Sequence, residues 1–421
     1  MKFFNKNKEN SAKSPQPSIT ISSLQRLIPI AQLNQQQLEK LPVRIKNFKA
    51  GQVVFNRGEI IESLDYLMAG ELYLEGEGEK AFQIEADTFY ALYPLATGQY
   101  YNVTAIVKKD AQILQLPVQA LSVCRKIYQS NQTKKLKIPE SLKNNSVLRG
   151  FLSSNNLKVP ALSNVVFKLR RAIEDDADLP SIVKIINLDP SLSAKLIQVS
   201  NSPLYRGVSP TSSCLAAINR IGLNATKNII TSISLSQLYS IKHRGIDKIA
   251  SYHWQQSVKI GALSYVLARE LKVCNPDEAM LAGLTCQIGV IPFLRYVDSV
   301  ADNEIDLSEV TAALPFVITS ISQIVLEKWG FPDEIKNLPL QIKDWFLIEA
   351  SERIQLADIV LLARYHGLLD GSLKTKLPPI TALPSFSHLK NGALTADKSL
   401  KILVDAQQQV RQAMQIFPQS R

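Results

Sequence analysis

Cysteine is scarce in this chain of 421 residues, and its four cysteines form no recognisable pattern. Cys124, Cys214, Cys274 and Cys286 stand 90, 60 and 12 residues apart, with no CxxC pair among them. Such spacing offers neither a disulfide framework nor a structural zinc site built on cysteines. We therefore expect reduced thiols and a cytoplasmic protein.

Long apolar runs are missing as well. No stretch of 18 uninterrupted apolar residues occurs, and the first 15 residues carry lysines without the apolar core of a signal peptide. The sequence thus predicts neither a membrane span nor secretion. P-loop, GxGxxG and GxSxG motifs are also absent, which argues against the common nucleotide-binding and serine-hydrolase classes.

The composition that remains is that of an ordinary globular protein, with 46% apolar and 20% charged residues, and the length predicts two or three domains. The net charge of +11 is unevenly spread: residues 1–50 and 101–150 each hold nine basic and two acidic side chains, whereas residues 51–100 hold two and nine. The basic stretch at 131–149 has no interleaved aromatic side chains and is predicted to be a solvated linker. Residues 1–19 are predicted to be a disordered tail.

Residues 20–130 have the pattern of a small all-β domain. Short runs of alternating apolar residues cover 53–55, 64–68, 72–74, 82–84, 105–107 and 113–116, and turn residues such as Gly58, Gly70 and Gly76 separate several of them. Period-two alternation broken by glycine is typical of an antiparallel sandwich or barrel. A closing helix is expected over residues 117–128.

Residues 50–59 and 64–72 resemble the opening of the cyclic nucleotide-binding domain family, a jelly roll of about 100 residues. In that family a Gly-Glu pair and a following arginine hold the ribose and phosphate, because only arginine offers a charged planar fork to phosphate oxygens. Here Tyr90 and Ala91 stand where Gly-Glu would fall, and Tyr101 stands in place of the arginine. The resemblance therefore implies the fold, while these three replacements argue against cyclic nucleotide binding.

The remaining chain, residues 150–417, has helical periodicity throughout. Helices are expected at 165–173, 180–187, 190–199, 214–221, 225–239, 254–271, 276–284, 310–329, 349–365 and 400–417. Asp189 followed by Pro190 and Asn224 before Ala225 are the predicted helix caps. The predicted fold class is multidomain α and β, an all-β jelly roll followed by an all-α helical domain.

Residues 160–166, 186–197, 199–205 and 217–223 resemble the HDOD domain in order and spacing, and 282–289 and 329–332 extend the match. The resemblance implies a helical relative of the HD metal phosphohydrolases that serves bacterial signalling. HD enzymes need histidines and aspartates around metal ions that activate a water molecule. Cys286 and Gln287 replace the His-Asp pair here, Gln256 stands near another ligand position, and Gln341 and Lys343 replace a further pair.

These replacements lead us to assign no catalytic, metal-binding or cofactor-binding residue and to expect no cofactor. Each of the four histidines, His243, His253, His366 and His388, is predicted to be a surface or helix-end residue. The expected function is that of a non-enzymatic regulator that acts through protein partners in a signalling pathway. Homodimer formation remains open.

Two alternatives stay open from the sequence. A helix-turn-helix-like unit at residues 212–238 would suit a DNA-binding transcription regulator, although its second helix offers Lys227 as the one cation. A pocket between the helices could hold a nucleotide second messenger through Arg206, Arg220 and Lys227. The residue types favour neither nucleic acid nor cyclic nucleotide as a ligand.

Overall fold

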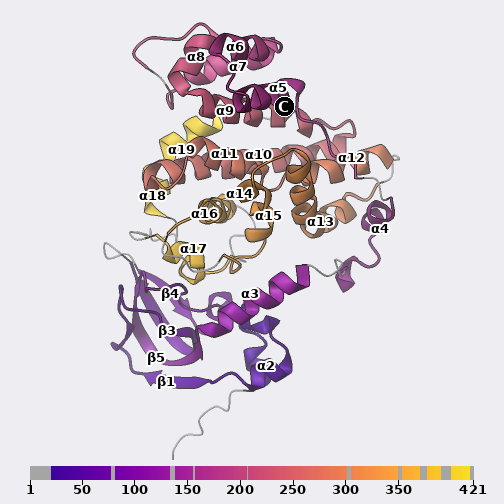
Figure 1. Ribbon diagram of the computed structural model, residues 1–421. Helices are drawn as coiled ribbons and strands as arrows, with labels where there is room; N and C mark the ends of the chain where they lie inside the picture. Colours follow the sequence, from indigo (N-terminus) through magenta and orange to yellow (C-terminus); the bar gives the residue numbers. More distant parts are fainter. Residues whose placement is uncertain are drawn as a thin grey trace, which may run out of the picture.

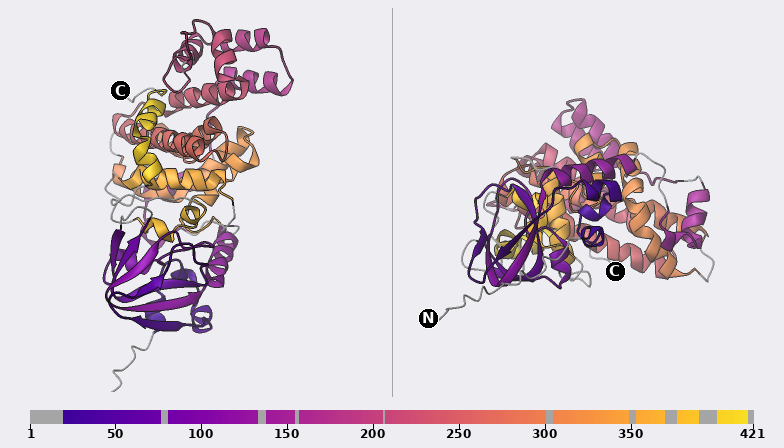
Figure 2. Two further views of the ribbon diagram at one scale, coloured as in Figure 1. Left: turned by 90° about the vertical axis from the view of Figure 1, so that its left-hand side faces the viewer. Right: turned by 90° about the horizontal axis from the view of Figure 1, so that it is seen from below.

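The structure is a computed structural model that describes residues 20–76, 81–132, 138–154, 157–205, 207–300, 305–348, 353–369, 377–389 and 400–417. A β part, residues 20–132, and a helical part, residues 138–417, are stacked along one axis (Figures 1 and 2). The predicted order of an all-β and an all-α region is thereby confirmed. The predicted disordered tail lies outside the described residues.

The β part is a five-stranded antiparallel sheet flanked by short helices. Its strands follow the order β1-β5-β3-β4, and β2 pairs with β5. The elements are α1 (Ile21–Leu24), η1 (Ile30–Gln32), α2 (Gln35–Glu39), β1 (Arg44–Phe48), β2 (Val53–Phe55), β3 (Ser63–Glu75), β4 (Ala81–Glu85), η2 (Phe89–Leu92), β5 (Thr104–Pro117) and α3 (Gln119–Gln132).

The predicted break at Gly70 is wrong, because β3 continues through this residue as one long strand. In the same way, β5 joins the predicted runs at 105–107 and 113–116 into one strand. Gly70 has a φ of +91°, and the pairing register with β5 shifts between Leu67 and Leu72. A Cβ atom at Gly70 would lie 2.3 Å from the carbonyl oxygen of Asp110. Glycine therefore forms a bulge in which two strands approach closely, rather than a turn.

The helical part is arranged around the long helix α10, which packs against α11, α12, α16 and α19. Helices α5 to α9 form a layer at the end far from the sheet, and α17 lies beside the sheet (Figure 1). The elements are η3 (Glu140–Leu142), α4 (Ser146–Ser153), α5 (Asn164–Glu174), α6 (Leu179–Ile186), α7 (Pro190–Ser200), α8 (Cys214–Ile221), α9 (Leu223–Ser236), η4 (Gln237–Tyr239), α10 (Arg244–Leu271), α11 (Pro276–Thr285), α12 (Val290–Val300), α13 (Leu307–Lys328), α14 (Asp333–Lys336), α15 (Leu338–Gln341), α16 (Leu356–Leu369), η6 (Ile380–Ala382), α17 (Pro384–Ser387), α18 (Lys401–Asp405) and α19 (Gln407–Met414).

The helix boundaries depart from prediction at several points. Helix α10 begins ten residues before Trp254, because the His243 side chain caps it, and histidine is not among the common cap residues. The backbone of Gly222, not the side chain of Asn224, begins α9. The last predicted helix is interrupted at Ala406, and α12 was not predicted. The Asp189 cap, in contrast, accepts hydrogen bonds from the N–H groups of residues 191 and 192, as predicted.

The stretch predicted as a basic linker, residues 131–149, holds η3 and the start of α4. Asn145 caps α4, and the Glu309 carboxylate of α13 accepts hydrogen bonds from the N–H groups of Ser146 and Val147 at 2.8 and 3.2 Å. These bonds attach the start of the helical part to α13.

Two apolar segments, Pro276–Val300 and Leu307–Lys328, are long enough to cross a membrane by length and composition. Most of each segment's apolar window is buried within the protein, 83% and 56% respectively. This burial is typical of core helices, and helices α11, α12 and α13 supply much of the apolar core of the helical part.

Candidate functional site

Three positions singled out in the sequence, Gln256, Cys286 and Gln287, line one cavity of about 700 Å³ in the helical part. Gln256 comes from α10, and Cys286 and Gln287 directly follow α11. Close packing of the two helices brings them together: a Cβ atom at Gly283 of α11 would lie 2.8 Å from the Cα atom of Gly261 on α10. The two glycines thus permit the helix crossing that assembles this wall of the cavity.

The other walls come from α13, from the segment after α15 and from α16. Ile318 of α13 and Leu368 of α16 are apolar, and Lys343 and Arg364 add two cations. Lys343 was named in the sequence as the replacement of a metal ligand, whereas Gln341 does not line the cavity. Arg364 and the α13 face were missed, because helical periodicity alone does not tell which face of a buried helix borders a cavity.

The thiol and the imidazole that line the cavity, Cys286 and His253, are electrically neutral near pH 7. Burial raises the pKa of Cys286 to about 12, and its thiol lies 3.1 Å from the carbonyl oxygen of Gly283. Burial also lowers the pKa of His253, one helical turn before Gln256, to about 4. An activated cysteine needs a depressed pKa, so this thiol has the properties of an inert one.

The donor set does not fit an HD-type metal centre. Such a centre needs several imidazole and carboxylate ligands on a divalent ion. Of the described residues that line the cavity, His253 is the one imidazole and none is a carboxylate. Within the described ranges, no cluster of three or more His, Cys, Asp or Glu side chains with metal-binding geometry is found.

The histidine prediction of a surface or helix-end position holds for His243, the cap of α10, for His366 in the last turn of α16 and for His388 at the end of α17. His366 and His388 are nevertheless buried, at 7% and 8% exposed, and His253 lies half-buried within α10. The His388 Nδ1 atom lies 2.9 Å from Oδ1 of the buried Asp358. A carboxylate partner of this kind satisfies a ring nitrogen inside the protein, and a single sequence does not reveal a pairing between residues 30 positions apart.

In the β part, the Tyr101 side chain is 6% exposed, and it lines a pocket of about 440 Å³ together with Arg44 and Lys46. Its ring stacks on Phe55 at 3.7 Å between centroids, and its hydroxyl donates a 2.9 Å hydrogen bond to Asp65. Burial and the Asp65 carboxylate raise the pKa of Tyr101, so the hydroxyl stays protonated. Ala91 is buried in η2, and Tyr90 is half-buried beside it. Position 101, which the resemblance matches to a phosphate-binding arginine, thus holds an aromatic ring fixed by stacking and by a carboxylate.

Residues 93–102 of the β part contact the helical part directly. Thr97 Oγ1 donates to the carbonyl oxygen of Ala382, and Asn102 Nδ2 donates to that of Phe386, each at 2.9 Å. The Tyr93 ring lies 6.1 Å from the ring of Phe346, with the planes 17° apart. Residues 93–102, which partly overlap the stretch that the resemblance matches to a ligand cassette, thus form part of the interface between the two parts.

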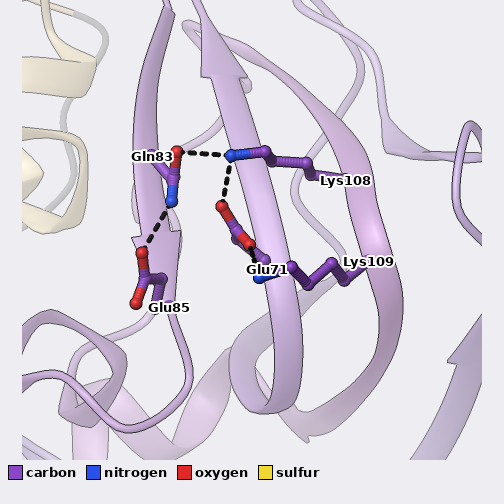
Figure 3. A network of polar contacts seen from close by, with 5 residues as sticks. All are labelled: Glu71, Gln83, Glu85, Lys108 and Lys109. Carbon is purple, nitrogen blue, oxygen red and sulfur yellow. Dashed lines mark hydrogen bonds and ion pairs between the residues drawn. The ribbon is translucent and has the colours of Figure 1, made fainter.

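A charged network lies on the sheet (Figure 3). Glu71 on β3, with its side chain 3% exposed, pairs with Lys108 and Lys109 on β5, each at 2.6 Å. Lys108 also donates to Gln83, whose amide donates to Glu85. Hydrogen bonds from both lysines lower the pKa of Glu71. This network links β3, β4 and β5, and both lysines are paired with a carboxylate. The alternating sequence pattern did not predict it.

Of the three basic residues considered for a nucleotide, the two that the structure describes have different surroundings. Arg206 lies outside the described residues. Arg220 donates to the backbone carbonyl oxygens of Ser200 and Ser209 and so holds the loop between α7 and α8. Lys227 lines a separate polar pocket of about 290 Å³.

The helix-turn-helix-like unit corresponds to α8 and α9, but α9 is a core helix. Ile229, Ile230 and Ile233 are at most 4% exposed, and α9 packs against α5, α7 and α11. A recognition helix must present its side chains to the DNA major groove. The burial of α9 argues against this alternative.

Comparisons with known proteins give matches to both parts of the chain. A family model described as HDOD domain matches residues 159–343. The chain is similar to a putative metal-dependent phosphohydrolase from Shewanella amazonensis SB2B, with 22% identity over 64% of this chain and 98% of that chain and a TM-score of 0.54. It is also similar to an HDOD domain protein from Geobacter sulfurreducens, with 17% identity, coverage of 66% and 97%, and a TM-score of 0.46.

The β part is similar to a putative cyclic nucleotide-binding protein from Geobacter metallireducens GS-15, with 20% identity over 27% of this chain and 85% of that chain and a TM-score of 0.22. No curated protein matches the chain. The chain thus combines an N-terminal antiparallel β part with an HDOD domain at residues 159–343.

Proposed function

We propose that this protein is a non-enzymatic, cytoplasmic regulator of bacterial signal transduction. Its HDOD domain acts through a protein partner, and its β part controls that interaction. A signalling role fits the HDOD match and the similarity to a putative signal transduction protein from Marinobacter aquaeolei VT8, which has 17% identity over 74% of this chain and 75% of that chain.

One observation carries the non-enzymatic proposal. Gln256, Cys286 and Gln287, which the resemblance matches to ligand positions of HD enzymes or their vicinity, line a cavity without a carboxylate among its described residues. Metal-assisted hydrolysis requires ligands that hold the ion and lower the pKa of a bound water molecule. Amide groups and a neutral thiol supply neither a strong ligand set nor a general base.

The control proposed for the β part rests on its contact with the helical part. Residues 93–102, which partly overlap the stretch that the resemblance matches to a ligand cassette, contact η6 and α17. A change in the conformation of this segment would alter its contacts with the HDOD side of the chain. The β part would thus transmit an input without binding a cyclic nucleotide at a charged site.

The test uses the full chain in two assays. Phosphodiester hydrolysis is measured with Mn²⁺, Mg²⁺ or Fe²⁺ for the wild type and for a double variant Cys286→His and Gln287→Asp. We expect no turnover by the wild type, whatever the double variant does. Affinity capture from the encoding bacterium should recover one reproducible partner, and a Phe346→Ala variant should change its recovery. Turnover by the wild type would refute the non-enzymatic proposal, and the lack of any reproducible partner would refute the adaptor role.

A further inference from the structure

The cavity of the HDOD domain combines the size and chemistry of a small-molecule site. Its volume of about 700 Å³ lies within the range of roughly 300 to 1,000 Å³ that is usual for ligand pockets. Ile260, Leu314, Ile318 and Leu368 supply apolar walls from α10, α13 and α16. Such walls favour a ligand with a hydrocarbon or aromatic body.

The charged groups among the described lining residues are of one sign. Lys343 and Arg364 are cations, and none of these lining residues is a carboxylate. Asp344 lies close enough to both cations for their charge to act on its pKa, and it lines a separate small pocket with Cys124 and Arg125 rather than this cavity. The polar end of a ligand in this cavity therefore meets positive charge.

Arg364 is held in place before any ligand arrives. Its Nη1 atom donates a 2.6 Å hydrogen bond to the carbonyl oxygen of Ile342, and its guanidinium lies 4.8 Å from the centroid of the Trp345 ring. A side chain held in this way loses little further conformational entropy on binding. The amides of Gln256 and Gln287 add uncharged hydrogen-bonding groups to the same cavity.

We propose that this cavity binds an amphipathic small molecule that carries one anionic group, a carboxylate or a phosphate, on an apolar body. The anionic group lies at Lys343 and Arg364, and the body packs against the walls from α10, α13 and α16. This site goes beyond the proposed adaptor function and does not depend on the identity of a protein partner.

The chain connects the cavity directly to the interface with the β part. Ile342 and Lys343 line the cavity, and three residues later Phe346 enters an apolar cluster built mainly from residues of the β part. A ligand that repositions Lys343 thus acts on a segment of five residues that ends in the interface. Trp345, between them, is a spectroscopic reporter of this segment.

The experiment is calorimetric titration of the full chain with four probes: decanoate, decyl phosphate, decan-1-ol and inorganic phosphate. We expect one-to-one binding of decanoate, decyl phosphate or both, and at least about tenfold weaker binding of decan-1-ol and inorganic phosphate. The tighter of the two anions identifies the head group. Equal affinity for decanoate and decan-1-ol, or no saturable binding of either anion, would overturn the proposal.

Variants locate the site. Lys343→Gln removes one cation from an exposed position and should weaken binding of the anionic probes about tenfold, whereas Lys328→Gln, an exposed lysine outside the cavity, should leave affinity unchanged. Gln256→Trp fills the cavity from α10 and should abolish binding, with thermal unfolding as the check of folding. Equal affinities of the two lysine variants would overturn the assignment. Since hydrolysis and partner capture are measured separately, failure here leaves the proposed function standing.

Discussion

Replacing Phe346 with alanine tests how firmly the helical part holds the β part. The side chain is 3% exposed and, with Ala382, joins a cluster otherwise built mainly from β-part residues between 24 and 124. Removing a buried phenylalanine side chain costs about 3 to 5 kcal/mol. Because each 1.4 kcal/mol is a factor of about ten in an equilibrium constant, the loss should shift the docking equilibrium by roughly a hundredfold or more.

The assay is native-state hydrogen exchange, followed on peptides that cover residues 93–102 and 380–388. In the Phe346→Ala variant we expect exchange in both segments to accelerate by roughly the same hundredfold factor, while peptides from α10 keep their wild-type rates. The matched control is Phe167→Ala, since Phe167 on α5 is 42% exposed and distant in sequence from the interface. Wild-type exchange in both segments of the variant would refute the view that Phe346 anchors the two parts.

Three further predictions concern the β part and the cysteines. Gly70→Ala should lower the stability of the β part by more than about 1 kcal/mol in thermal unfolding, because residue 70 has a positive φ and the new Cβ atom would meet the carbonyl oxygen of Asp110. A wild-type melting temperature of this variant would contradict the bulge. Burial raises the pKa of Asp65 above its ordinary value near 3.8, so the stability that the protonated carboxyl group contributes is lost as pH rises through the folded-state pKa. The Asp65→Asn variant has no such loss, and its melting temperature should therefore rise relative to that of the wild type between pH 4 and pH 7. Parallel pH profiles of the two melting temperatures would refute this. Thiol labelling of the native protein at pH 8 should modify at most the half-buried Cys274, and rapid native-state labelling of Cys286 would contradict its pKa of about 12.

Local sequence signals predicted much of the fold. Period-two alternation located the β part, and the Asp189-Pro190 pair predicted the start of α7 correctly. The errors arose where one residue type has two structural uses. Glycine at position 70 is compatible with a turn or a bulge, and only the pairing of β3 with β5 decides between them.

The candidate site was predictable in part. The resemblance drew attention to Gln256, Cys286 and Gln287, and the structure places all three on one cavity. Arg364 lies more than 70 residues further along the chain, and its part in the cavity depends on the packing of α16 against α10 and α11. The contact of residues 93–102 with η6 and α17 was hidden for the same reason, since it joins segments nearly 300 positions apart.

The central claim is that the HDOD domain no longer performs metal-dependent phosphodiester chemistry. The most direct measurement is the metal content of the purified full chain after incubation with Mn²⁺, Fe²⁺ and Mg²⁺ and removal of free ions, combined with a phosphodiesterase assay on the same sample. Our account predicts substoichiometric metal and no turnover. One or more tightly held equivalents of metal, together with hydrolysis that Cys286→Ala or Gln287→Ala abolishes, would contradict it.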